Sequence, residues 1–302
     1  MKKVVIAGGT GFVGSILAEH YVQKGYEVVV LSRRHHLDKD GIRFVQWDGK
    51  NYGSWNQELE ATEILINMNG KSVDCRYNEG NKQEIYASRI DSTYILGQAI
   101  EVLDNPPKLW INSSSATIYR HAEDRQMDEA TGELGTGFSV DVCKKWEQAF
   151  FETKTKGTRK VALRMAIVLG KHGGALQPLV QLTKLGLGGK QGNGEQFFSW
   201  VHEEDLLRAV DFIQENKEME GPINIAAPAP VKNCLVMKML RNATRIPVGL
   251  PAPKWLLEIG AVLIQTETEL ILKSRNVIPG KLTKMGFDFQ FPTLELAIKD
   301  LV

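Results

Sequence analysis

The sequence predicts an α/β protein built on a doubly wound parallel sheet. Over the first half of its 302 residues, short apolar stretches alternate with amphipathic ones, a pattern typical of parallel strands covered by helices on both faces. The first apolar stretch, residues 4–7, runs directly into a glycine-rich turn. The predicted strands are residues 4–7, 26–31, 42–47, 63–68, 108–112, 161–169 and 222–226. The long predicted helices are residues 82–103, 138–156 and 203–214.

The glycine-rich turn predicts a dinucleotide-binding unit with the Rossmann strand–turn–helix. Its glycines have the spacing Gly9-x-Gly11-x-x-Gly14. In such a turn the first glycine allows a tight bend, the second lets the backbone approach a pyrophosphate, and the third lets the helix pack closely. The phosphates lie at the helix N-terminus, where free N–H groups and the helix dipole favour negative charge. The residues assigned to this part of the site are Gly8, Gly9, Thr10, Gly11, Phe12, Val13 and Gly14.

The end of the second predicted strand favours NADP(H) over NAD(H). An NAD site usually has an Asp or Glu there, which bonds the ribose 2′-hydroxyl. This strand instead ends in Ser32, Arg33 and Arg34, which suit charge-assisted contacts with a 2′-phosphate. The alternative is an NAD site beside a solvated basic turn. Asp48, after the third strand, is placed to bond the adenine amino group, but a plain Asp-Gly turn would have the same sequence.

Polar residues at the ends of later strands are further candidates for the cofactor site. Asn67 lies at the end of the fourth predicted strand, and Ser113 and Ser114 follow the fifth. Ligands of such sheets bind at the carboxyl ends of the strands. We therefore assign these three residues to cofactor binding, and we expect Ser115 to lie beside the nicotinamide.

Charge and cysteine usage exclude several function classes. The chain has 37 Lys and Arg against 36 Asp and Glu, a formal charge of +1, which gives no reason to propose a nucleic acid or a membrane as partner. No stretch approaches the length of a membrane span. Three distant cysteines without a CxxC motif predict a reducing compartment, so we expect a cytoplasmic protein without disulfides. His35 and His36 lie in a polar loop without a carboxylate pattern, and we assign no metal site.

A change in composition near residue 170 predicts two lobes. The segment 170–194 is rich in glycine and lysine, and prolines interrupt the helical stretches after residue 233. We predict a Rossmann domain over residues 1–170, completed by about residues 200–226, and a smaller substrate-binding lobe over residues 171–302.

Three motifs resemble the extended short-chain dehydrogenase/reductase superfamily: residues 8–14, residues 113–119 and residues 200–205. The chain is most similar to the atypical branch of epimerase family proteins, also described as nucleoside-diphosphate-sugar epimerases. The stretches that carry this similarity are residues 88–90, 146–147, 163–170, 173–176, 187–194, 250–253 and 291–294. The resemblance covers nearly the whole chain and implies a Rossmann domain with a small C-terminal substrate lobe.

The superfamily's chemistry uses a Tyr-x-x-x-Lys pair on the helix after the fifth strand, and this chain lacks it. Aligning Glu147 with the glutamate that usually follows the motif puts Ser139 at the tyrosine and Cys143 at the lysine. A shift by one residue gives Phe138 and Val142. The usual asparagine of the preceding helix is also replaced, near Arg89. The close branch itself lacks these residues, so their loss does not argue against the family.

The remaining candidates for catalysis are Ser115, Tyr119, Ser139 and Cys143. Tyr119 is either a substitute acid or a packing tyrosine, and Cys143 is either a polarised thiol or a plain buried cysteine. Trp200 and His202 are the candidate substrate contacts, and His202 could equally make a structural hydrogen bond. Aromatic residues stand where sugar-nucleotide epimerases usually have an arginine for the substrate's pyrophosphate, which predicts a more apolar pocket.

Two functions follow from these observations. The first is an NADP(H)-dependent oxidoreductase or epimerase-like enzyme that acts on a small carbonyl or alcohol, or on a sugar nucleotide as the family name implies. The alternative is a non-catalytic NADP(H)-binding sensor or interaction protein. In this superfamily the helices after the fourth and fifth strands commonly pair into a four-helix bundle, so the resemblance allows a homodimer.

Overall fold

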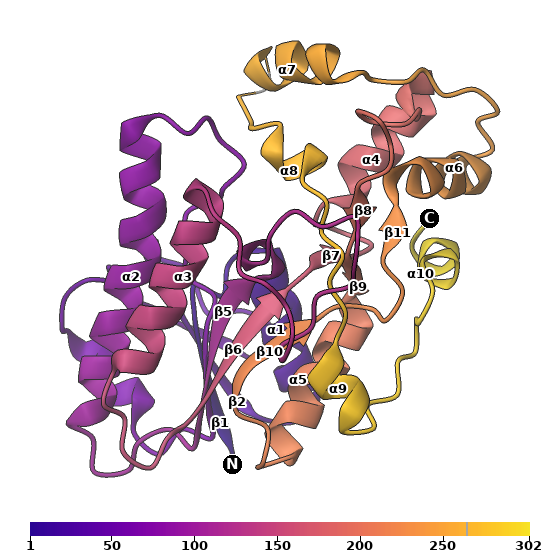
Figure 1. Ribbon diagram of the computed structural model, residues 1–302. Helices are drawn as coiled ribbons and strands as arrows, with labels where there is room; N and C mark the ends of the chain where they lie inside the picture. Colours follow the sequence, from indigo (N-terminus) through magenta and orange to yellow (C-terminus); the bar gives the residue numbers. More distant parts are fainter. Residues whose placement is uncertain (264) are drawn as a thin grey trace.

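The protein contains one large parallel sheet, seen at the centre of the computed structural model in Figure 1, which describes residues 1–263 and 265–302. Its seven strands have the order β10-β6-β5-β4-β1-β2-β3, and every neighbouring pair is parallel. The strands are β1 (Lys3–Ala7), β2 (Glu27–Ser32), β3 (Ile42–Gln46), β4 (Ile64–Asn67), β5 (Leu109–Ser115), β6 (Arg159–Met165) and β10 (Gly221–Ile225). Strand order reverses between β1 and β4, and the predicted doubly wound fold is confirmed.

Helices cover both faces of this sheet because successive strand residues point to opposite sides. On one face, Val4 and Ile6 pack in a core with α1 (Phe12–Gln23) and α5 (Glu203–Glu215). On the other face, Val5 and Ala7 pack with α2 (Glu79–Glu101) and α3 (Phe138–Glu152). Helices α2 and α3 lie side by side (Figure 1). The short helices η1 (Ser54–Leu59) and η2 (Ala116–Ile118) complete the connections.

A smaller lobe lies beyond the carboxyl ends of the strands and has its own apolar cluster. Its helices are α4 (Leu176–Leu182), the π-helical η3 (Thr183–Leu187), α6 (Asn233–Thr244), α7 (Lys254–Leu263), α8 (Glu269–Leu272) and α10 (Leu294–Leu301). Two small sheets join it to the rest: β7 (Ile167–Leu169) pairs in parallel with β9 (Trp200–His202), and β8 (Phe197–Phe198) pairs antiparallel with β11 (Val231–Lys232).

The structure corrects one predicted strand and its pairing. The single strand predicted over residues 161–169 is interrupted at Ala166, whose N–H bonds the carbonyl of Ile225 at 2.9 Å. The following residues form β7 and leave the large sheet. Strand β9, predicted to return to that sheet, pairs with β7 instead.

The C-terminal segment returns to the large sheet before it enters the small lobe again. Helix α9 (Gly280–Lys284) contacts β10, and Leu282 and Phe287 are buried in the same core as Val4 and Ile6. The chain then continues to α10 in the small lobe (Figure 1). The division of the chain at residue 170 stays a prediction.

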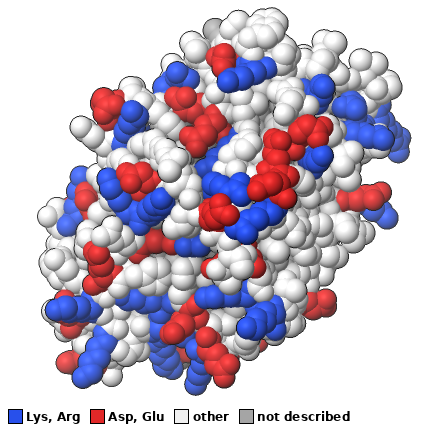
Figure 2. Space-filling view, viewed as in Figure 1, with Lys and Arg blue, Asp and Glu red and all other residues white. Residues whose placement is uncertain are grey.

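Charged side chains of both signs are interspersed over the face shown in Figure 2, in line with the balanced composition. Among the described helices, none is both long enough and apolar enough to span a bilayer.

Candidate functional site: two adjoining cavities

The turn after β1 bends at Gly8, not at Gly9 as the motif predicted. Gly8 has a φ of +74°, in the left-handed region, and a Cβ there would lie 2.7 Å from the Cα of Asn69. Any other residue would therefore be strained and would also collide with backbone. Gly9 has no positive φ, and its absent side chain leaves room for Ile6 and Val30.

Gly11 and Gly14 have the geometry that the predicted roles need, open space at Gly11 and close packing at Gly14. Gly11 is the N-cap residue of α1, and a Cβ built on it would meet nothing within 4 Å, so it faces open space. A Cβ on Gly14 would lie 2.6 Å from the Cα of Gly9, so the helix is pressed against the turn. The free N–H groups of α1 thus face a cradle that a Cβ at Gly11 would partly fill, as a pyrophosphate site requires.

Phe12 and Val13, at the start of α1, anchor the turn to the core of the large sheet. The side chains of Phe12 and Val13 pack on the core of the large sheet, and the ring of Phe12 leaves no room for a Cβ on Gly170 or Gly173. Only their backbone at the start of α1 is available to a ligand. Thr10 lines the cavity itself.

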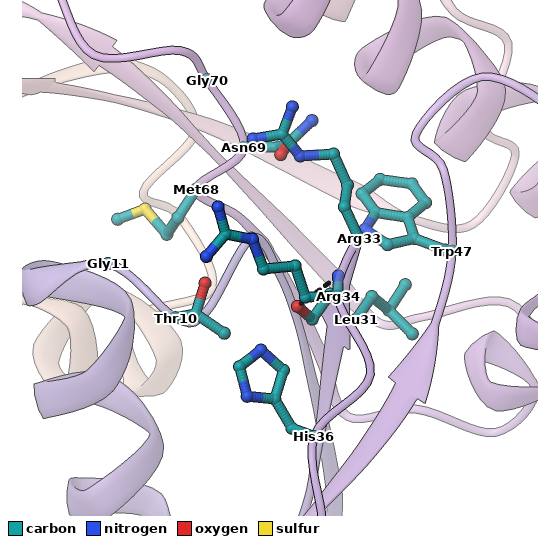
Figure 3. Close-up of a pocket in the computed structure, with 12 residues that line it drawn as sticks. Thr10, Gly11, Leu31, Arg33, Arg34, His36, Trp47, Met68, Asn69 and Gly70 are labelled. Atoms are coloured by element: carbon teal, nitrogen blue, oxygen red, sulfur yellow. Dashed lines mark hydrogen bonds between the residues drawn. The ribbon is translucent and has the colours of Figure 1, made fainter.

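A cavity of about 670 Å³ opens beside this turn (Figure 3). Arg33 and Arg34 extend from the end of β2 into it, and His36 lies across from Thr10 (Figure 3). The N–H of Arg34 donates to Oγ of Ser32 at 3.3 Å, which fixes the strand end. Among the described residues that line the cavity, none is a carboxylate. These residues are Gly8, Thr10, Gly11, Leu31, Ser32, Arg33, Arg34, His36, Trp47, Met68, Asn69 and Gly70.

Asp48 does not line this cavity but lines a neighbouring one that shares Arg33 and Trp47 with it, so its assignment to the cofactor's adenine stays a prediction. Its Oδ1 accepts the N–H groups of Lys50 and Asn51 at 2.8 Å, and its Oδ2 accepts the side-chain amide of Asn51 at 2.6 Å. These bonds lower the pKa of the Asp48 carboxyl. Asp48 thus caps its own Asp-Gly turn, and its exposed carboxylate stays a candidate contact for the adenine.

Asn67 is corrected, because it lies fully buried behind the cavity wall. Its Nδ2 donates to Oδ1 of Asn112 at 2.7 Å and to Oγ1 of Thr93 at 3.2 Å, and its Oδ1 accepts the N–H of Asn69 at 3.1 Å. Asn67 thus holds Asn69, which lines the cavity and which the sequence analysis missed. The signal for Asn69 was its position two residues beyond the end of β4.

A second, smaller cavity of about 190 Å³ adjoins the first, and both are lined by Met68 and Gly70. It lies between α2, α3 and the end of β5, with Leu270 of α8 on its outer side. Its other lining residues are Val73, Tyr77, Ile85, Arg89, Ser113, Ser114, Ser115, Thr117, Phe138, Ser139, Val142, Cys143 and Trp146.

The three serines at the end of β5 form one wall of the small cavity rather than of the large one. Oγ of Ser115 accepts the N–H of Thr117 at 3.2 Å and begins η2. Oγ of Ser114 donates to Oε1 of Glu147 at 2.6 Å. Glu147 also accepts Nε and Nη2 of Arg164, each at 2.8 Å, in a buried two-pronged ion pair. Ser114 thereby connects this wall of the cavity to the ion pair of Glu147 and Arg164.

Ser139 and Cys143, one helical turn apart on α3, both line the small cavity. Oγ of Ser139 donates to Oε2 of Glu269 at 3.0 Å and lies 3.4 Å from the hydroxyl of Tyr77. Burial raises the pKa of the Cys143 thiol to about 12, so Cys143 is neutral and is not the polarised thiol considered from sequence. Tyr77 and Glu269 were missed because they are distant in sequence, in a loop before α2 and at the start of α8, and belong to no motif.

Tyr119 is a packing residue, which corrects its assignment as a substitute acid. Only 1% of its surface is exposed, and it does not line either cavity. Its hydroxyl donates to Oδ1 of Asn224 and accepts Nη1 of Arg164, both at 2.9 Å. Burial raises the pKa of its phenol.

The structure also corrects the assignment of Trp200 and His202 to substrate. Trp200 is fully buried in the small lobe, and its Nε1 donates to the carbonyl of Ala229 at 3.2 Å. His202 caps α5, with its Nδ1 accepting the N–H of Glu204 at 3.1 Å, and its ring is stacked on Phe291 at 3.7 Å between centroids. Neither residue lines the two cavities. His202 lines a separate pocket between α1, α5 and α10, where its Nε2 lies 3.3 Å from Oδ2 of Asp300, and its contacts within the protein are those of a structural residue.

Comparison with known proteins agrees with this geometry. The sequence model of the NAD dependent epimerase/dehydratase family matches residues 4–226. The chain belongs to this family. Residues 252–301 match a second model, a domain of unknown function (DUF1731). An epimerase family protein of Staphylococcus epidermidis is 32% identical over 303 residues, which are 100% of this chain and 99% of that protein.

Solved structures of the epimerase/dehydratase family superpose over nearly the whole chain. The human epimerase family protein SDR39U1, crystallised with NADPH, has a TM-score of 0.87 and 28% identity, covering 99% of this chain and 98% of that chain. A nucleoside-diphosphate sugar epimerase from Corynebacterium glutamicum has a TM-score of 0.79 and 27% identity, covering 99% of this chain and 58% of that chain. The resemblance to extended short-chain dehydrogenases/reductases is confirmed, and with it a nicotinamide cofactor as the ligand of the family's fold.

Proposed function

We propose that this protein is an NADP(H)-dependent oxidoreductase that acts on a small carbonyl or alcohol. The observation that carries the proposal is the pair Arg33 and Arg34, which extends into a cavity without a lining carboxylate. Guanidinium groups there suit a 2′-phosphate, whereas an NAD site usually offers an acid. The human relative crystallised with NADPH supports the same choice.

The small cavity supports hydride chemistry on a compact substrate. When bound, the cofactor supplies or accepts a hydride. Ser139 replaces the family's tyrosine, and its hydroxyl is already hydrogen-bonded to the carboxylate of Glu269. For alcohol oxidation, the substrate hydroxyl gives its proton to Oγ of Ser139 while Ser139 passes its own proton to Glu269. Carbonyl reduction runs this transfer in reverse, and the hydroxyl of Tyr77 lies close enough to orient the substrate oxygen.

The first test is the binding of NADPH and NADH, followed by the quenching of tryptophan fluorescence. We expect NADPH to bind at least tenfold more tightly, about 1.4 kcal/mol, and R33Q/R34Q to abolish this preference while NADH binding stays the same. R208Q, which removes an arginine of α5 outside both cavities, is the control. An NADH preference would contradict the assignment of the arginines.

The second test is turnover with a panel of small aldehydes, ketones and alcohols. We expect NADPH oxidation with at least one carbonyl, and a loss of at least a hundredfold in kcat in S139A and E269Q with cofactor affinity unchanged. Turnover that persists in both variants would refute the proton relay.

The alternative, a non-catalytic NADP(H)-binding sensor, is favoured by one specific observation. Helix α7 exposes Trp255 (61%), Ile259 (53%) and Val262 (60%), and the surface over it carries few charges (Figure 2). Such a patch suits a protein partner. Tight NADPH binding without turnover on any carbonyl, together with a partner that binds in only one cofactor state, would favour this function over the enzyme.

A further inference from the structure

Arg89 of α2 is a half-buried cation held in the wall of the small cavity. Its guanidinium lies 5.1 Å from the ring centre of Trp146, and a Cβ on Gly70 would be 3.0 Å from its Cζ. Its Nη1 donates to the carbonyls of Lys71 and Ile85 at 3.0 and 3.1 Å. The side chain is thus fixed by the hydrogen bonds of Nη1 and by the contacts of its guanidinium with the ring of Trp146 and the backbone at Gly70.

The other edge of this guanidinium has no protein partner. Among the described residues, none accepts a hydrogen bond from Nε or Nη2 of Arg89. These two nitrogens present parallel N–H donors along one edge, the geometry that matches the two oxygens of a carboxylate. A fixed guanidinium with this edge free is prepared for a planar anion.

The charge of Arg89 is also not neutralised within the cavity. No described lining residue is an Asp or Glu. Burial lowers the pKa of the Arg89 guanidinium, but an arginine stays charged in proteins. Lys273 and Arg275 lie behind Thr117, whose carbonyl accepts Lys273 at 2.7 Å and whose hydroxyl accepts Arg275 at 3.0 Å. Lys273 has a carboxylate of its own, because its Nζ lies 3.9 Å from Oε1 of Glu269. A half-buried cation without a counter-ion carries a desolvation cost, and an anionic ligand would reduce that cost.

The size of the cavity limits this ligand. At about 190 Å³ it is smaller than the roughly 300–1,000 Å³ typical of sites for drug-sized ligands. Val73, Phe138 and Leu270 supply apolar walls opposite the polar groups. A short acid fits within these dimensions, whereas most of a sugar nucleotide would have to lie outside the cavity.

We infer that the small cavity binds a short hydroxy or oxo carboxylic acid whose carboxylate pairs with Nε and Nη2 of Arg89. This inference rests on the proposed function, because the hydroxyl or carbonyl of the acid is the group presented to Ser139. Arg89 is then the residue that selects an acid over a neutral carbonyl compound.

The test is calorimetric binding of oxamate and malonate, each compared with its neutral amide, to the protein loaded with NADP⁺. We expect at least one acid to bind tenfold or more tightly than its amide. We expect R89Q to abolish this preference and R89K to retain part of it, with NADPH affinity unchanged in both. R208Q should behave like the wild type.

Equal binding of acid and amide by the wild-type protein, or failure to bind either acid, would overturn the inference, whether or not the variants fold. Failure to bind NADPH would instead refute the proposed function. In that case the same titrations on the unloaded protein decide the role of Arg89: an acid preference lost in R89Q supports it, and no preference overturns it.

Discussion

The buried pair of Glu147 and Arg164 is predicted to be one of the largest single contributions to the stability of the site. In E147Q, Arg164 loses its two charge-assisted bonds of 2.8 Å and keeps only neutral acceptors, the hydroxyl of Tyr119 and the single amide oxygen of the new glutamine, whose NH2 group faces the guanidinium unfavourably. Both side chains of the pair are 9% exposed, so water cannot replace the lost carboxylate. Removing one member of such a pair costs about 3–5 kcal/mol.

The assay is equilibrium unfolding in urea, followed by tryptophan fluorescence and circular dichroism without cofactor. We expect E147Q to lose about 3–5 kcal/mol, and E147M/R164M to lose less than the sum of the two single variants, because no uncompensated charge is left. E195Q, in an exposed pair with Lys232, should leave the unfolding midpoint unchanged. An E147Q protein within about 1 kcal/mol of wild type, or additive single variants, would refute the reasoning.

Three further outcomes are expected. G11A should change the free energy of unfolding in urea by no more than about 1 kcal/mol, yet bind NADPH at least tenfold more weakly. G14A should lower the free energy of unfolding by about 1–3 kcal/mol, because its methyl group overpacks the turn. Similar behaviour of the two variants would contradict the assignment of the cradle. Because the pKa of Cys143 is raised to about 12, its thiol stays neutral at pH 8, and peptide mass spectrometry should show iodoacetamide modifying Cys75 long before Cys143. H202A should lose about 1–3 kcal/mol from its cap and its ring stack without any change in cofactor or substrate KM; a raised KM would restore His202 to the site.

The cofactor half of the site could be predicted because its signals are local in sequence. The turn, the helix start and the end of β2 each follow from a few consecutive residues, and Gly11, Arg33 and Arg34 lie where the motif puts them. The bend at Gly8 was missed because spacing does not reveal which glycine has a positive φ.

The proposed substrate half was predicted only in part: the candidates Ser115, Ser139 and Cys143 line the small cavity, but the residues that contact Ser139 reach it only through tertiary packing. Tyr77, Ser139 and Glu269 approach from a loop, from α3 and from the small lobe.

The sequence analysis also made the opposite error, in that it assigned Tyr119 and His202 to the site because they are polar residues within motifs. Their hydrogen bonds instead stabilise the interior. A polar side chain in a motif indicates a constraint, and only the structure shows whether a ligand or the fold imposes it.

The return of α9 to the large sheet has a consequence for how the chain folds during synthesis. Leu282 and Phe287 occupy the same core as the first strand, although some 280 residues separate them. A nascent chain that has emerged up to residue 226 contains every strand of the large sheet but still exposes the part of the core that α9 covers. Closure of that core therefore waits until residues 280–287 have left the ribosome, and a chain truncated after β10 should aggregate more readily than its nearly complete sheet suggests.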